Sequence, residues 1–229
     1  MKKIAPFLLL FMMLLAGCAP QAQPTEDPAV PTGEDTDSLD DVLIHRLAVN
    51  LGLEQSEIAL ISREDVEFGD LCLDVARFDT ACAQAVTPGQ IFIFEANGLA
   101  YEYRTTAAGD SIQPATLALT WTREGGIAGF CDRLAVYLSG EVYASNCRSQ
   151  PNETSGSMAV LVSAAQIKEF NAWYLEFGKT ALDVSDPTGV SDRMENTLVF
   201  YGSGSGRPGK ADEQTLFDWA NELFQKLYS

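Results

Sequence analysis

The sequence predicts an α+β fold of two small domains, each an antiparallel sheet packed with one or two helices. Three observations lead to this prediction. An Asn97-Gly98 pair separates two β-rich runs, which is the pattern of a tight hairpin. Two serines, Ser38 and Ser163, stand as helix caps before apolar residues at helical spacing. In the second half the patterns follow the order β-β-β-(β)-α-β-α, which fits two helices on one antiparallel sheet.

Residues 1–17 are predicted to be an export signal, because Lys2 and Lys3 precede a short apolar run. That run is too short to span a membrane. Its ending, L-A-G-C, resembles the lipobox of bacterial lipoproteins. The resemblance implies cleavage before Cys18 and attachment of a diacylglycerol, with acyl chains such as palmitate, to its sulfur. We therefore expect a lipid-anchored protein of the cell envelope that faces outside the cytoplasm. An ordinary secretory signal with an incidental cysteine is the alternative.

Residues 18–37 are predicted to be a disordered, acidic and proline-rich tether, because they carry too little apolar surface to order themselves. The whole chain has 32 Asp and Glu against 15 Lys and Arg, a net charge of −17. This excess argues against nucleic acid and against adsorption to anionic headgroups. Membrane attachment is therefore expected to come from the lipid.

Residues 38–106 are predicted to form the first domain. A leucine every fourth residue marks a helix at 39–51, which Gly52 ends. Short strands at 58–62 and 66–68 precede the hairpin of 91–96 and 99–104. His45 is expected on the helix surface, and a pH switch or a ligand role is its alternative. Residues 107–115 are polar and small, and we interpret them as the domain boundary.

Four cysteines remain once Cys18 carries the lipid, and an oxidising compartment predicts two bridges among them. Of three possible connectivities, Cys72–Cys82 and Cys131–Cys147 are favoured, because each pair then lies within one domain. A disulfide that closes a loop of about 15 residues stabilises the folded protein by roughly 3 kcal/mol in the chain-entropy model. Zinc is disfavoured, because C-x-x-C is missing and the sequence has one histidine.

Residues 117–229 are predicted to form the second domain. The expected elements are strands at 117–123, 132–138, 141–147, 158–162 and 196–201, and helices at 164–177 and 212–228. A polar loop at 149–156 and an irregular stretch at 181–193 separate them. The three tryptophans are expected in the core.

The stretch R-E-G-G-I-A-G, which begins at the last residue of the strand at 117–123, resembles the opening motif of the emfourin family, R-x-G-G-[FI]-A-G. Those small proteins are related to a bacterial inhibitor of protealysin and other thermolysin-like (M4) metallopeptidases. The matching positions are Arg123, Gly125, Gly126, Ile127, Ala128 and Gly129. The resemblance covers roughly 117–229 and implies an inhibitor-like domain. The cysteine pair, the loop at 149–156 and the fusion to another domain depart from the family pattern.

The expected function is a membrane-anchored protein-binding module, with an exported metallopeptidase or another envelope protein as partner. Its contact would be Arg123 with the loop of Gly125, Gly126, Ile127 and Gly129. These glycines also suit a plain hairpin turn with Arg123 on the surface. The alternative function is a small-ligand or glycan-binding lipoprotein with an aromatic-lined cleft. We expect no catalytic residue, cofactor or metal, because a histidine-paired serine and calcium-loop spacing are both missing.

A second glycine-rich stretch, residues 202–210, has the spacing of a phosphate loop but carries Pro208 and Ala211. Pro208 removes one N–H, and Ala211 stands where a Mg²⁺-binding hydroxyl is needed. It is predicted to be a flexible connector and not a nucleotide site.

Overall fold

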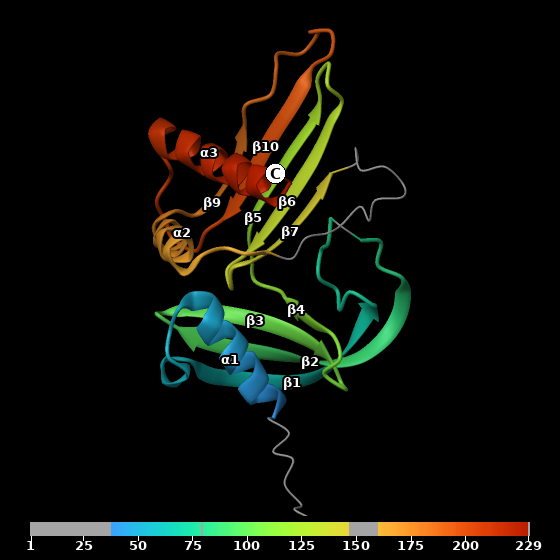
Figure 1. Ribbon diagram of the computed structural model, residues 1–229, viewed down its shortest axis with the longest axis vertical. Helices are drawn as coiled ribbons and strands as arrows, with labels where there is room; N and C mark the ends of the chain where they lie inside the picture. The colour runs from blue at the N-terminus through green and yellow to red at the C-terminus, as the bar shows by residue number, and fades with distance from the viewer. Residues whose placement is uncertain (1–37, 79, 147–159, 229) are drawn as a thin grey trace, which may run out of the picture. The chain divides into compact units, whose positions relative to one another are not determined.

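The computed structural model of the protein describes residues 38–78, 80–146 and 160–228 (Figure 1). The helices are α1 (Leu39–Leu51), α2 (Ala164–Glu176) and α3 (Lys210–Leu227), with a 3₁₀ turn at Gln55–Glu57. The first sheet contains β1 (Ala59–Asp70), β2 (Gln84–Ala96), β3 (Leu99–Thr106) and β4 (Ile112–Pro114). The second contains β5 (Leu117–Gly125), β6 (Phe130–Tyr137), β7 (Glu141–Asn146), β8 (Val160–Leu161), β9 (Lys179–Asp183) and β10 (Met194–Tyr201). Two antiparallel sheets with helices confirm the α+β prediction.

The first sheet has the strand order β1-β2-β3-β4, and α1 lies across it (Figure 1). Ser38 caps α1 as predicted, since its Oγ accepts a hydrogen bond from the Asp41 N–H at 3.3 Å. Gly52 ends the helix in the left-handed region, with φ of 67°. The Asn97-Gly98 hairpin also forms, and it pairs β2 with β3.

The first sheet differs from the prediction at both edges. The two short strands expected at 58–62 and 66–68 are one strand, β1, which pairs along its length with β2. Most β1 side chains are exposed, so the apolar alternation that would predict a long strand is missing. The expected boundary at 107–115 contains β4, whose three residues pair with β3. A strand this short leaves little sequence signal.

The second sheet has the order β8-β7-β6-β5-β10-β9, and α2 and α3 cover one of its faces. The predicted capping box of Ser163 and Gln166 begins α2. The prediction of an irregular stretch from 181 was wrong at its start, because β9 pairs there with β10. In β9 only Leu182 is buried, so the strand carries a single apolar marker.

One continuous hydrophobic cluster draws residues from both sheets and all three helices. Phe170 of α2 lies between Phe200 and Trp219, with ring centroids at 5.6 and 4.9 Å. Trp121 packs on Phe224 of α3 and is 1% exposed. Trp173 and Trp219 are partly buried and pack against the same cluster, so the core prediction is confirmed in full for Trp121 alone. None of the helices among the described residues combines the length and the hydropathy that a membrane span requires.

A buried carboxylate joins the two sheets. Glu141 of β7 is 2% exposed and accepts hydrogen bonds from Nε and Nη2 of Arg46 in α1, at 2.8 and 2.7 Å. The Tyr103 hydroxyl of β3 donates to it at 3.2 Å, and the Ser139 hydroxyl donates as well. Burial and the nearby Glu141 carboxylate raise the pKa of the Tyr103 phenol far above its ordinary value. The buried Glu141 carboxylate therefore depends on Arg46, Tyr103 and Ser139 for its hydrogen bonds.

Removing the charge of Arg46 is expected to lower stability more than removing the charge of Glu141. Arg46→Met leaves a buried carboxylate with neutral donors only, so unfolding free energy should fall by about 3–5 kcal/mol. Glu141→Gln keeps the shape, and Arg46 is partly exposed and can turn to water, so about 1–3 kcal/mol is expected. Urea denaturation measures both. The double variant should be more stable than Arg46→Met alone, and a double variant less stable than both singles would contradict this account.

Candidate functional site

The β5–β6 turn is held in one shape by its glycines. Gly125 and Gly126 have φ of 80° and 69°, where a side chain would be strained. A Cβ on Gly125 would meet the Arg193 carbonyl oxygen at 2.4 Å, so the two backbones touch. The Gly126 N–H also donates to the Arg193 oxygen at 3.0 Å. The turn is thus fixed to the segment that leads into β10.

Ile127 stands at the tip of this turn, and the residue is 93% exposed. It is the most exposed large hydrophobic residue among those described. The neighbouring connection between β9 and β10 exposes Val184 and Val190 by about half. That connection is also internally bonded, since Asp186 accepts from the Met194 N–H at 2.9 Å. This end of the second sheet therefore combines exposed aliphatic side chains with a fixed backbone.

Arg123 lies at the base of the turn, and its side chain is 16% exposed. Its Nε and Nη2 donate to one oxygen of Asp132 at 2.9 and 2.5 Å. Its guanidinium also lies over the Phe130 ring at 4.1 Å and contacts the Asn221 amide oxygen at 3.4 Å. Arg123 therefore supports the turn from within the protein. The predicted site residues are brought together, with Ile127 outward and Arg123 inward.

Asp132 is the residue of this region that the sequence reasoning missed. It sits opposite Arg123 in the β5–β6 register and is 1% exposed. Asn146 lies opposite Asp132 and Asn196 lies opposite Arg123, so a polar row crosses the helix-covered face of four strands. Correct pairing of the hairpin about Gly125–Gly129 would have placed Arg123 and Asp132 together.

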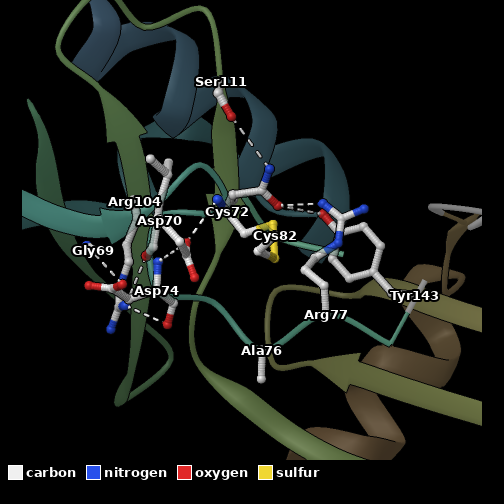
Figure 2. Close-up of a disulfide and its surroundings, with 12 residues drawn as sticks. Gly69, Asp70, Cys72, Asp74, Ala76, Arg77, Cys82, Arg104, Ser111 and Tyr143 are labelled. Carbon is white, nitrogen blue, oxygen red and sulfur yellow. Dashed lines mark hydrogen bonds between the residues drawn. A yellow bond between two sulfur atoms is a disulfide. The ribbon is translucent and has the colours of Figure 1, made fainter. Parts of the chain in front are cut away.

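The disulfide Cys72–Cys82 is present as predicted, with the Sγ atoms 2.02 Å apart (Figure 2). Cys131 is disulfide-bonded too. Cys147, its predicted partner, and Cys18, the predicted lipid site, lie outside the described residues. Asp70, Cys72 and Cys82 bring their ligand atoms close together, yet both sulfurs are in the disulfide and are not available as thiolates.

The loop closed by this disulfide is bonded to both sheets (Figure 2). On the first sheet, Arg104 Nη1 donates to the carbonyl oxygens of Leu73 and Asp74, both at 3.0 Å. On the second sheet, the Tyr137 hydroxyl donates to the Ala76 carbonyl at 2.8 Å. The Arg77 guanidinium lies 3.9 Å from the centroid of the Tyr143 ring. The disulfide thus fixes a segment that bridges the two sheets.

His45 lies on the exposed face of α1, as expected, with its Nδ1 3.0 Å from the Gln55 amide nitrogen. Among the described residues, neither a carboxylate nor a serine hydroxyl forms a hydrogen bond with this histidine.

The glycine-rich stretch 202–210 is not the flexible connector that was predicted. The N–H groups of Ser203, Gly204 and Gly206 donate to carbonyl oxygens at the end of α2, at 2.8–3.0 Å. A Cβ on Gly204 would lie 2.3 Å from the Glu176 oxygen, so glycine is required for this close approach. The stretch therefore satisfies the last carbonyls of α2. These N–H groups are engaged and cannot converge on a phosphate.

Arg123→Met is expected to lower the unfolding free energy by about 3–5 kcal/mol, because it leaves the Asp132 carboxylate buried without its cation. Arg133→Met is the matched control. Arg133 follows Asp132 on β6 and pairs with Glu124 at 2.8 Å, with both side chains nearly half exposed. Such a pair contributes about 1 kcal/mol or less. Equal losses for the two variants in urea denaturation would contradict the bracing role of Arg123.

Gly204→Ala is expected to destabilise by about 1–3 kcal/mol, because the added methyl overlaps the backbone of α2. Gly209→Ala in the same stretch meets only the flexible Asp212 carboxylate, at 3.4 Å, and should cost at most about 1 kcal/mol. Thermal unfolding followed by circular dichroism measures both. If Gly204→Ala melts like the parent protein, the stretch is not pinned as described.

Residues 41–114 match the family described as "Domain of unknown function (DUF8738)". The match begins within α1, ends at the last residue of β4 and leaves the second sheet unmatched. The search of curated proteins and the search of solved structures found no match for this chain.

Proposed function

We propose that this protein is a lipid-anchored, extracytoplasmic binding module that contacts a partner protein through its β5–β6 turn. The observation that carries the proposal is Ile127, an aliphatic residue 93% exposed at the tip of a rigid turn. Burial of this side chain against a partner would remove apolar surface from water, which favours association.

The rigidity of the turn supports this role. Binding by a loop costs free energy when the loop must become ordered, and a fixed loop avoids most of that cost. Here the Gly126 hydrogen bond to Arg193 and the Arg123–Asp132 ion pair hold the turn from two sides. Contact with a partner would fall on Ile127 and the adjacent backbone, with Arg123 acting through the shape of the turn.

The proposed location rests on the chain's N-terminal sequence and on its cysteines. The L-A-G-C motif before residue 19 has the form of a lipidation site. A bridge between Cys72 and Cys82 suits an oxidising compartment. We propose Cys18 as the lipid attachment site and the stretch to residue 37 as the tether.

The finer proposal concerns the partner, which we infer to be an exported thermolysin-like metallopeptidase. Its support is the resemblance of Arg123 and Gly125–Gly129 to the opening motif of the emfourin family. An aliphatic side chain on a fixed, projecting turn has the form needed to enter a substrate cleft.

The test uses the protein beginning at Ala19, which keeps all described residues, titrated against thermolysin up to high micromolar concentration. The native protein should inhibit, and Ile127→Asp should weaken inhibition at least tenfold, because a charge would replace the buried contact. Val49→Asp is the control, since Val49 is 59% exposed on α1. Absence of inhibition would overturn the peptidase as partner.

A second arm tests the wider proposal of a protein contact. A photo-crosslinking amino acid at position 127 in the producing cells should give a discrete adduct, and the same group at position 49 should not. Equal labelling at both positions, or none at 127, would contradict the turn as a contact surface.

A further inference from the structure

A cleft of about 650 Å³ runs along α2, apart from the β5–β6 turn. The end of α1 and the β2–β3 turn form its opposite side. Its volume lies within the range of small-molecule sites. The floor is apolar, with Leu51, Leu99 and Ile167 each at most 9% exposed.

The shape of the cleft suits an elongated ligand. Its α2 wall runs from Ala164 to Leu175, which is roughly 16 Å at the helical rise. The short side chains of the alanines at 164, 165 and 172 leave room for a ligand beside the helix. A Cβ on Gly52 would lie 2.9 Å from that of Ala164, so α1 approaches closely and limits the cleft at this end.

The charge of the cleft is opposite to that of the chain. Among the lining residues that the structure describes, Lys168 is the one that carries a charge, although acidic residues outnumber basic ones in the chain by 32 to 15. Lys168 stands one helical turn after Ala164, at the beginning of α2. The first N–H groups of that 13-residue helix add positive potential at the same end. The cleft thus has a cationic end, and its other described lining residues are uncharged and mostly apolar, with Asn97 and Asn171 as the polar ones.

We propose that this cleft binds a single-chain amphiphile with a carboxylate head, that is, a fatty acid. The chain would lie along the alanine wall over Leu51, Leu99 and Ile167. The carboxylate would lie at Lys168 and the N-terminal end of α2. A glycan is the less suitable occupant, because none of the described lining residues is aromatic and a sugar ring stacks on such a side chain.

This proposal is independent of the binding role assigned to the β5–β6 turn, because the two surfaces share no residue. A fatty acid and a partner protein could therefore be bound at once. A negative result in the peptidase experiment would therefore not count against ligand binding in the cleft. A negative result in the amphiphile experiment would not count against partner binding by the turn.

The experiment is isothermal titration calorimetry of the protein beginning at Ala19 with dodecanoate below its micellar concentration. We expect saturable binding of one dodecanoate per chain. Octanoate should bind more weakly, by up to about fourfold for each methylene removed. Dodecyltrimethylammonium has the same chain with a cationic head and should bind at least tenfold more weakly. No saturable heat with dodecanoate, or equal affinity for the cationic amphiphile, would overturn the proposal.

Variants locate the site. Ala172→Trp should abolish dodecanoate binding by filling the cleft, and Lys168→Glu should weaken it at least tenfold by reversing the charge. Lys210→Glu is the charge control, because Lys210 lies on α3 outside this cleft. If Ala172→Trp does not fold, Ala165→Phe serves as the second filling variant, since Ala165 is exposed. Full dodecanoate affinity in a folded filling variant would place the ligand elsewhere and overturn the proposal.

Discussion

The buried carboxylate of Glu141 is the constraint on which the joining of the two sheets depends. An ion in an apolar interior is tolerated only when its oxygens are fully bonded. Here the partners come from α1, from β3 and from the residue two before Glu141. The first sheet with α1 and the second sheet must therefore pack together before the Glu141 carboxylate has all its hydrogen bonds. The disulfide-closed loop reinforces the same union from another side, through Tyr137 and Arg77.

Most regular elements could be predicted from the sequence, because their signals are local. Ser38 and Ser163 cap their helices by hydrogen bonds to residues three positions later. The Asn97-Gly98 turn needs only its own two residues. What could not be predicted depends on distant partners. Strand β9 exists because β10 pairs with it, and the 202–210 stretch is ordered because the end of α2 supplies acceptors.

The candidate site shows the same division. The emfourin-like motif and the backbone freedom of glycine predict a tight turn at Gly125, Gly126 and Gly129, and these residues do form one turn. The role of Arg123 could not be read from the sequence, since it depends on the strand register that sets Asp132 opposite. Likewise the cleft along α2 draws its lining from three segments that are far apart in the chain. Sequence patterns give residue types within an element, whereas cavities arise between elements.

The position of β1 at the edge of its sheet affects whether copies of the protein associate with one another. In the described part of the chain its twelve residues pair on one side only, with β2. A strand edge of that length, with unpaired N–H and C=O groups, can pair with a strand of a neighbouring copy. Its sequence carries Arg63, Glu64, Asp65 and Glu67 in close succession, and the ladder has a bulge after Leu60. Charges and a bulge discourage edge-to-edge growth, so a high local concentration of the protein would favour separate molecules over fibrils.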